Sequence, residues 1–451
     1  MLTLKKETVP FLVDFDEDQE RVMQNSSGKL LEERTKSLEL FNKNGIPTIK
    51  NEEWIHTNLN VHLRESFSLL PVIDATKVDQ YTKIAKEMLD EIYHAEQEQE
   101  YDVYYIVSVN GTWRPGISKL PHPDHLNVQS LLDAQDQEIF QEHFNQIIDL
   151  EKHALSALNT ALFENGICIE VPKNTKVDKP FHILHIWDTA QPTWYHSRNL
   201  IKLNSSASFE LIETHRSLSD TKSVVSSVTE VVVENNAHFY HYEVQSKQEG
   251  LIIVNALDAS QKKDSNYLNY TFTLPGSEFV RNNLSIYLDD HHLETHMYGF
   301  YLTAGKQLVD NHSEVHHKFT YGESNQLYKG VLLDESKGVF NGKIYVYPQA
   351  QKTNAFQESA NVLYSPNATV NAKPQLEIFA DDVKCSHGAT MGQMDAEALF
   401  YLKSRGIGEA TAKKMMIRAF AYDVSQKVEN PTLKVYIEKL IDEAMNHYIA
   451  D

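Results

Sequence analysis

The hydrophobic periodicity of this chain changes twice, and these changes constrain its fold more than any other feature of the sequence. Before about residue 165 the apolar residues recur at three- and four-residue spacing, whereas between residues 167 and 390 short apolar runs alternate with polar positions. Helical spacing returns after residue 395. Periods of 3.6 and 2 are typical of amphipathic helices and half-buried strands. We therefore expect a mostly helical first region, an all-β middle and a helical tail.

The first region is predicted to contain several helices and one hairpin. Three helical stripes are formed by Leu31, Leu38 and Phe41, by Ile84, Met88 and Ile92, and by Leu155, Leu158 and Leu162. Gly45 ends the first stripe and Gly166 ends the third, as glycine commonly does at a helix C-terminus. Residues 103–109 are rich in β-branched and aromatic side chains, and they run into Asn110-Gly111. That dipeptide is the strongest short signal for a β-hairpin.

The middle region shows strand-like runs separated by polar corners, and no convincing helix. The runs are 181–186, 209–212, 230–234, 239–244, 284–288 and 343–347, and the corners include 204–206, 235–236, 275–276 and 366–367. A β-sandwich, a β-barrel and a β-solenoid all fit this pattern. The spacing of the corners is too irregular to identify a solenoid from a repeat period.

The tail is predicted to form three helices. Asp395 is a plausible N-cap for the first helix, whose apolar stripe begins at Leu399 and Leu402 and ends at Gly406. The second helix opens near Gly408-Glu409 and carries on one side Ala412, Met415, Met416, Ala419 and Phe420. The third helix covers residues 433–448 and is amphipathic with mixed charge.

Net charge excludes two classes of partner. The chain carries a formal charge of −21, yet its last residues, from Glu397 on, contain eight basic and eight acidic side chains. An acidic protein is a poor ligand for a nucleic-acid backbone or an anionic membrane. We expect neither as the main partner. The start of the chain lacks the apolar core of a secretory signal, so we expect a cytoplasmic protein with reduced thiols.

The two cysteines give the chain one candidate metal-binding pair. Cys385 and His387 are one residue apart, so on a strand both side chains point to the same face. A thiolate beside an imidazole suits iron or zinc. The alternative is a buried thiol beside a hydrogen-bonded histidine, because two ligands do not complete a site. Any iron–sulfur chemistry here would need further ligands from another chain. Cys168, between two isoleucines, is expected to pack in the core.

Two groups of histidines are a second candidate. They are His291, His292 and His296, and His312, His316 and His317. On a strand, His292 and His296 share a face, as do His312 and His316, so each pair could flank a metal with Asp and Glu nearby. The alternative is polar residues on the wet face of a β-layer.

Conventional catalytic motifs are absent from the sequence. It has no G-x-S-x-G, no Walker A motif, no H-E-x-x-H and no dinucleotide-binding glycine fingerprint. The segment SRGIGEATAKKMM resembles a helix-hairpin-helix that grips DNA phosphate, with Lys413 and Lys414 following the turn. The neutral tail and the acidic chain oppose this reading, and an ordinary αα-hairpin packed on a neighbour is the alternative.

Four segments carry a resemblance that spans almost the whole chain. The segment from Asp381 to Ile407, DDVKCSHGATMGQMDAEALFYLKSRGI, resembles the signature of the SufB/SufD family of iron–sulfur assembly proteins. Residues 45–59, 157–174 and 340–368 resemble further segments of that family, in the family's order. SufB-type members carry a Cys-Asp where Gln357, Glu358 and Ser359 stand here. The form K-C-S-H-G-A-T resembles the SufD-type members instead.

The resemblance implies a right-handed parallel β-helix core over residues 167–392. An N-terminal, mostly helical region (1–166) and a C-terminal helical domain (393–451) would flank it. It also implies a non-catalytic scaffold subunit that pairs with a SufB-type subunit through the β-helix cores and binds a SufC-type ABC ATPase through the tail. The tail residues expected at that ATPase interface are Leu402, Arg405, Gly406, Gly408, Met415, Met416 and Phe420.

By the same resemblance, Cys385 and His387 take positions at the interface with the SufB-type subunit, where a transient iron–sulfur cluster or iron would be shared. The family complex is linked to reduced flavin, but no flavin motif is visible in this sequence. Homodimerisation of the isolated chain stays open, as does metal binding by the histidine groups. The alternatives are a β-helix enzyme acting on an acidic or polymeric substrate, and DNA binding through the tail.

Overall fold

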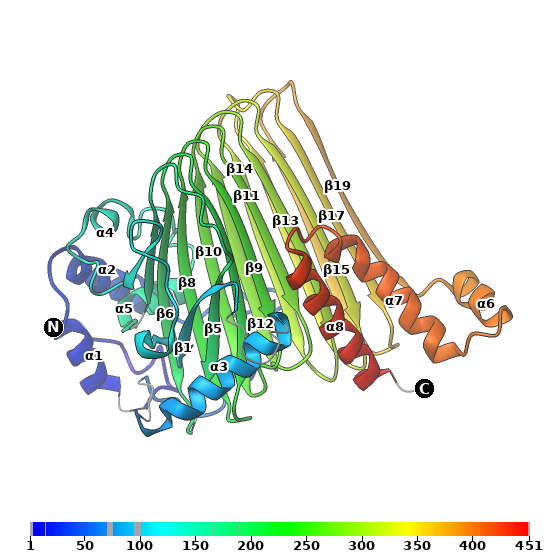
Figure 1. Ribbon diagram of the computed structural model, residues 1–451, viewed down its shortest axis with the longest axis horizontal. Helices are drawn as coiled ribbons and strands as arrows, with labels where there is room; N and C mark the ends of the chain where they lie inside the picture. Colours follow the sequence, from blue (N-terminus) through cyan, green and yellow to red (C-terminus); the bar gives the residue numbers. More distant parts are fainter. Residues whose placement is uncertain are drawn as a thin grey trace.

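The structure, a computed structural model, describes residues 3–13, 15–69, 75–93, 101–164, 166–188 and 190–449. Its middle is a parallel β-solenoid of about eight turns (Figure 1). Successive strands from β4 to β19 alternate between two sheets, so each turn gives one strand to each sheet. The parallel β-helix predicted from the resemblance is thereby confirmed, and the sandwich and the barrel are excluded.

One sheet has ten strands and the other has nine. The ten-stranded sheet contains β1 (Tyr104–Val109), β2 (Thr112–Trp113), β5 (Phe181–Trp187), β7 (Ser208–Ser217), β9 (His238–Gln245), β11 (Asn266–Thr273), β13 (Glu294–Thr303), β15 (Glu323–Leu332), β17 (Asn354–Leu363) and β19 (Lys384–Gln393). The nine-stranded sheet contains β3 (Asn127–Ser130), β4 (Ile167–Val171), β6 (Trp194–Leu203), β8 (Ser223–Val233), β10 (Leu251–Gln261), β12 (Phe279–Leu288), β14 (Leu308–His317), β16 (Lys337–Val346) and β18 (Thr369–Ile378).

Helices flank the solenoid at both ends of the chain. They are α1 (Phe15–Gln24), α2 (Gly28–Asn44), α3 (Val78–Tyr93), α4 (Glu138–His143), α5 (Ala154–Leu162), α6 (Ala396–Ser404), α7 (Glu409–Ser425) and α8 (Pro431–Tyr448), with short 3-10 helices η1 (Glu52–Trp54), η2 (Leu59–Val61), η3 (Ala75–Lys77) and η4 (Pro115–Ile117). The three predicted tail helices are confirmed. The side chain of Asp395 caps α6 by accepting from the backbone N–H groups of Glu397 and Ala398. None of the described helices is long and apolar enough to span a membrane.

Seven turns of the solenoid have a corner residue in the left-handed conformation. These residues are Asn174, Ser206, Asn236, Asp264, His292, Tyr321 and Lys352, spaced 28–32 residues apart. The N–H of each donates to a carbonyl of the next turn, as from Asn236 to Lys263 and from His292 to Thr320. The corner residues differ in type, so this period is not visible in the sequence.

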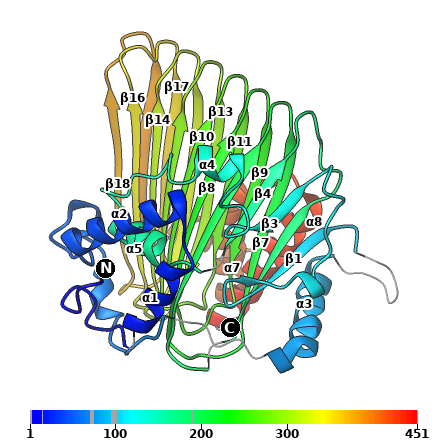
Figure 2. The same cartoon turned by 90° about the vertical axis from the view of Figure 1, so that its left-hand side faces the viewer.

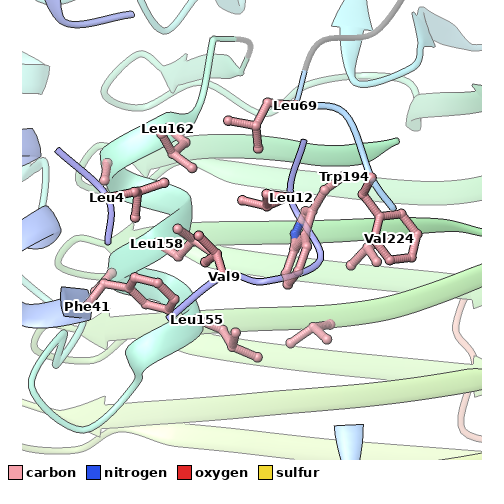
Figure 3. Close-up of a cluster of buried hydrophobic side chains, with 14 of the residues drawn as sticks. Leu4, Val9, Leu12, Phe41, Leu69, Leu155, Leu158, Leu162, Trp194 and Val224 are labelled. Atoms are coloured by element: carbon pink, nitrogen blue, oxygen red, sulfur yellow. The ribbon is translucent and has the colours of Figure 1, made fainter. Parts of the chain in front are cut away.

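The hydrophobic core lies mainly between the two sheets. Inward-facing side chains of both sheets form one cluster, in which Phe209, Phe239 and Tyr267 stack from turn to turn with centroid distances of 5.9 and 5.2 Å. A second cluster joins α5 and the N-terminal segment to the outer face of the nine-stranded sheet, with Leu155, Leu158 and Trp194 among its members (Figure 3). Figure 2 shows α2 and α5 across that face.

The outer face of the ten-stranded sheet is covered by helices from both ends of the chain. Helices α7 and α8 pack on it through a cluster that includes Ile417, Val424 and Ile437, and α3 packs on its first strands. Helix α6 contributes no buried residue and lies outside the stack of strands (Figure 1). The tail therefore doubles back along the solenoid and leaves its last turn uncovered.

The buried face of α2 differs from the predicted stripe. Leu38 and Phe41 are fully buried, but Leu31 is 38% exposed, and Leu30 occupies the buried position instead. The buried face continues through Arg34, and because this residue is charged, the helical spacing of buried positions is not visible in the sequence. The Arg34 guanidinium is buried because it donates to the carbonyls of Ala161 (3.0 Å) and Phe163 (2.7 Å).

The first region also contributes strands to the solenoid. The predicted hairpin is confirmed as β1 and β2, with Asn110 and Gly111 both at positive φ as a type I′ turn requires. Strand β1 continues in parallel onto β5, and β3 pairs antiparallel with β4. The sequence did not predict β3, which is only four residues long.

Candidate functional site

The last turn of the solenoid ends in two unpaired strand edges. Strand β18 pairs only with β16, and β19 pairs only with β17, within the part of the chain that the structure describes. We call β18, β19 and the corner between them (379–383) the open end. It exposes apolar side chains, including Phe379 (62%) and Met391 (56%). Unpaired edges and exposed apolar groups are features of a surface made for another chain.

Cys385 and His387 lie together on β19, as their spacing predicts. Their partners on β17 are Ala355 and Gln357, which are 0% and 3% exposed. Both side chains therefore follow the inward-facing rows of the ten-stranded sheet. Cys385 is half-buried against the small cluster that includes Ala355, whereas His387 is exposed because no further turn covers it.

The Cys385 thiol is not activated in the isolated chain. Burial raises the pKa of this thiol above its ordinary value, and the backbone hydrogen bond with Ala355 offsets this only in part. The thiol form therefore predominates at neutral pH. Since the thiolate is the metal ligand, metal binding here must release a proton.

Buried amides continue inward from His387. Gln357 Nε2 donates to Gln326 Oε1 at 2.7 Å, and Gln326 in turn donates to the hydroxyl of Ser313. Gln357 Oε1 is buried and accepts no hydrogen bond from the described residues. Gln357 is the strand partner of His387. Its free oxygen can therefore accept a hydrogen bond from one nitrogen of the His387 imidazole and orient the ring while the other nitrogen binds a metal.

The pair is at most half of a metal site. Among the residues that the structure describes, no three His, Cys, Asp or Glu side chains are arranged to hold a metal ion. A tetrahedral site or an iron–sulfur cluster needs four ligands. Cys385 and His387 could therefore supply two of them, with the others coming from outside the described residues.

The first histidine group does not converge. His292 lies in the left-handed corner before β13 and stacks on Tyr321, so it does not share a strand face with His296, and that prediction is wrong. The strand begins only at Glu294, because the corner occupies residues 289–293. His296 pairs instead with Glu294 at 2.6 Å.

The second histidine group is divided between the two faces of β14. His312 and His316 do share the outer face, but His312 lies between Asp310 (2.9 Å) and Glu53 (3.3 Å), and His316 stacks on Tyr345. His317 points inward and its Nε2 hydrogen-bonds with Ser324. These side chains are mostly engaged with their own neighbours in the sheet.

The second cysteine is structural, as predicted. Cys168 on β4 is 1% exposed and packs among side chains that include Phe140 and Leu200. Burial raises the pKa of its thiol to about 12. It is therefore unavailable to metal or oxidant in the folded chain.

Four of the predicted tail residues, Leu402, Arg405, Gly406 and Gly408, lie at or beside the turn between α6 and α7, whereas Met415, Met416 and Phe420 lie further along α7. Gly406 ends α6 with φ of 84°, and Gly408 is the N-cap of α7. Arg405 lies 5.1 Å from the Tyr401 ring, and Met415 is 46% exposed. Phe420, by contrast, faces the solenoid, with Lys329 Nζ 4.3 Å from its ring centre.

Two exposed aromatic residues on α6 were missed by the sequence reasoning. Phe400 is 74% exposed and Tyr401 is 57% exposed. Their signal was present, because α6 is apolar on nearly every side (Ala-Glu-Ala-Leu-Phe-Tyr-Leu), which a helix packed by one face does not need. Met415 on α7 is a further exposed apolar side chain of this helical hairpin.

Comparisons with known proteins agree over nearly the whole chain. The family model described as "SUF system FeS cluster assembly, SufBD core domain" matches residues 185–420, and that of the "SufBD protein N-terminal region" matches residues 6–183. An iron–sulfur cluster assembly SufBD family protein of Synechocystis is 28% identical over 417 residues, which cover 90% of this chain and 89% of that protein. The iron–sulfur cluster assembly protein SufD of Escherichia coli is 28% identical over 401 residues, covering 87% and 88%. SufD of Bacillus subtilis is 27% identical over 299 residues, covering 65% and 68%.

Proposed function

Because the chain belongs to the SufBD family of iron–sulfur cluster assembly proteins, we propose that it is a SufD-type scaffold subunit, without catalytic turnover of its own, that acts in the cytoplasm. The observation that carries this proposal is the open end, where Cys385 and His387 lie on the inward row of a terminal strand. In this proposal the open end pairs with a SufB-type subunit. The nascent cluster is cargo that the two subunits share and pass on to apo-proteins.

The chemistry of the pair supports a shared site. Cys385 and His387 offer one sulfur and one nitrogen ligand, and the described residues offer no third group arranged around them. Mixed thiolate and imidazole ligation suits iron. A partner strand that continues the ten-stranded sheet beyond β19 would bring its own inward-facing side chains alongside this pair, because parallel strands align equivalent rows.

We propose further that the hairpin of α6 and α7 binds a SufC-type ABC ATPase. Its exposed surface contains Phe400, Tyr401 and Met415, with the tight turn at Gly406 and Gly408 between the helices. Aromatic and Met side chains are enriched in protein interfaces. In this division of labour, residues 1–166, 167–392 and 393–451 serve as N-terminal region, pairing core and ATPase-binding domain.

The first test concerns His387. The complex is reconstituted with a SufB-type subunit and a SufC-type ATPase. In it, His387→Ala is expected to slow cluster formation by about tenfold or more, which is the usual effect of removing one residue that binds or orients a metal ligand. Cluster absorbance and bound iron are the measurements. Ser386→Ala, an exposed neighbour on the opposite side of the strand, is the matched control. Wild-type rates from His387→Ala would contradict the assigned role.

The second test separates the two interfaces. Met415→Glu places a charge in the proposed ATPase surface and should abolish co-purification with the ATPase while pairing with the SufB-type subunit persists. Val435→Glu alters a residue of α8 that is 58% exposed, so it should leave both contacts intact. If Met415→Glu retains the ATPase, the helical hairpin is not the docking surface.

A further inference from the structure

A cavity of about 580 Å³, lined by polar and apolar groups in similar measure, lies between the outer face of the nine-stranded sheet and the helical layer that covers it. Its walls are the first turn of α5, the segment that follows α2 and the strands β8, β10, β12 and β14. We call it the α5 cavity. None of its lining residues belongs to the open end or to α6 and α7. Its volume is in the range of small-molecule sites.

The first turn of α5 brings unused hydrogen-bond donors to this cavity. His153, the N-cap residue, provides no side-chain cap. The backbone N–H groups of Ala154, Leu155 and Ser156 make no hydrogen bond to the described residues, and all three residues line the cavity. Free N–H groups at a helix N-terminus, together with the positive end of the helix dipole, favour an anion.

Arg281 is a second and independent donor on the opposite wall. It is 2% exposed, and its guanidinium lies 3.8 Å from the Trp54 ring centre. Nε donates to Asn283 Oδ1 (3.1 Å), while Nη1 donates to Asp310 Oδ2 (2.6 Å) and to the carbonyl of Glu53 (2.9 Å). Nη2 makes no hydrogen bond to the described residues. The Arg281 guanidinium is thus held rigidly, and only its Nη2 group is left to donate a hydrogen bond.

His153 links the two walls. The pKa of its imidazole is lowered to about 4, chiefly by burial and also by the positive charges of Lys152 and Arg281, which Glu314 and Asp149 partly oppose. Both residues line the α5 cavity: His153 and Arg281. At neutral pH the uncharged imidazole can still donate one hydrogen bond into the cavity.

The carboxylates around the cavity are mostly neutralised by partners of their own. Glu53 pairs with Lys343, and Glu314 pairs with Lys152. Glu52, on the rim, pairs with Lys373 at 3.1 Å. Two exposed lining residues, Glu151 and Lys43, carry opposite charges that form no ion pair with the described residues, so they offset each other. The groups without partners on the buried walls are chiefly donors.

We propose that the α5 cavity binds a small organic oxyanion, a carboxylate or a phosphate ester, whose charged group lies between the first turn of α5 and Arg281. Backbone N–H groups and a guanidinium N–H, here the Nη2 group of Arg281, are donors that both oxyanions accept from. The remaining volume accommodates the rest of the molecule against the seryl hydroxyls of β8 and β12. This site is separate from the open end, so its occupant is not the cluster.

The test uses isothermal titration of the full chain with pyrophosphate and, separately, with citrate. Ala154→Glu is the informative variant, because a carboxylate in the first turn stabilises a helix while it repels a bound anion. It should weaken binding by about tenfold or more, the value of one lost charge-assisted contact. Thr432→Glu places the same charge in the first turn of α8, far from the cavity, and should bind as the wild type does.

The two probes distinguish the sources of the anion. Binding of pyrophosphate alone assigns a phosphate ester, binding of citrate alone assigns a carboxylate, and binding of both assigns an oxyanion in general. Binding of neither, or binding that is unchanged in Ala154→Glu, overturns the proposal. Arg281→Lys keeps a positive charge beside Asp310 but removes the Nη2 donor, so it should also weaken binding. An unchanged melting temperature of this variant shows that the loss is not due to unfolding. Cluster assembly is not a readout, so this result stands apart from the proposed function.

Discussion

The two cysteines differ in how much protein covers them. Cys168 is enclosed by α4 and β6, whereas Cys385 lies on the terminal strand with one side open to solvent. Both thiols have a pKa raised by burial, to about 12 for Cys168. Reactivity follows the thiolate fraction and access, so the two residues should be separable by simple alkylation.

At neutral pH the native isolated chain should take up one iodoacetamide label, slowly, at Cys385. The rate should stay below that of free cysteine and rise with pH beyond 9, because the raised pKa keeps the thiol protonated. Intact mass measured over time gives the rate. Cys385→Ser should remain unlabelled until urea exposes Cys168. Rapid labelling of Cys385 at pH 7 would show that the thiol is activated after all.

Buried charged residues form a network that joins segments far apart in the sequence. Arg281 and Asp310 are buried on neighbouring strands, and Glu53 reaches them from the helical layer. Burial alone would raise the pKa of Asp310, but Arg281 and His312 hold it at about 2. No local pattern marks such residues, because each one resembles an ordinary surface charge until the fold pairs it. The pair Cys385 and His387 could be predicted because both lie within a single motif.

At the scale of elements, the corners of the solenoid repeat in conformation and not in residue type. Asn236 has φ of 57°, and its N–H donates to Lys263 in the next turn. Glycine adopts this conformation without strain, and asparagine and aspartate adopt it at a lower cost than other residues do. The sequence therefore shows no repeat period, since residues of different types occupy equivalent corners, among them Ser206, His292, Tyr321 and Lys352.

Replacing Asn236 by valine should therefore destabilise the chain by about 1–2 kcal/mol, because a β-branched residue is strained in the left-handed region. Urea unfolding measures the change in the free energy of unfolding. Asn236→Gly is the matched control, since glycine adopts this conformation without strain and should cost little. Equal losses in both variants would point to the Asn236 side chain, and not to the backbone conformation.

The buried face of a helix could be predicted from the sequence where it consists of apolar residues alone. The stripes of α3 and α5 are buried as expected. In α2 the buried face passes through Arg34, whose charge is satisfied by carbonyls of α5 and the segment after it. A charged residue in a buried stripe cannot be recognised without its partners, which explains the error at Leu31.

At the scale of the whole molecule, the solenoid is covered on both faces but not at its last turn. The tail packs alongside β13 and β15, so the edges of β18 and β19 and the side chains of Phe379 and Met391 are exposed. Such edges tend to pair with another chain. We therefore expect the isolated protein to form homodimers through its open end.

Met391→Lys should weaken that dimer by about tenfold or more, since truncating or charging a central apolar anchor typically costs over 1 kcal/mol. Sedimentation velocity over a concentration series gives the dissociation constant. Val435→Lys, on the exposed side of α8, should leave the dimer unchanged. A strictly monomeric wild type at high concentration would contradict the expectation.

Several histidines are buried in neutral form, and this makes stability depend on pH. Burial lowers the pKa of His182, His196 and His317 to about 3. The unfolded chain binds protons on these groups below pH 6.5, and the folded chain does not. The unfolded state thus binds more protons there, so stability rises with pH and is lost as the pH falls.

The free energy of unfolding should fall between pH 6.5 and about pH 4, by on the order of 1 kcal/mol per pH unit for each such histidine. Urea unfolding at pH 7.5 and pH 5 measures the slope. His196 stacks on Trp194, so His196→Phe retains a ring at that position and should reduce the slope by one histidine's share. A slope unchanged in this variant would assign the effect to other groups.

The sequence alone determined the order of helical and β regions, the hairpin at Asn110-Gly111, the pairing of Cys385 with His387 and, through its motifs, the family. These features follow from local periodicity or from contiguous residues, which a sequence displays directly. Periodicity left a sandwich, a barrel and a solenoid open, and the family resemblance favoured the solenoid. Only the tertiary structure decided that its last turn is open, that the histidine groups do not converge and that Arg281 and the first turn of α5 line one cavity. Those features arise from contacts between residues tens or hundreds of positions apart, and burial and hydrogen bonding select them only once the chain has folded.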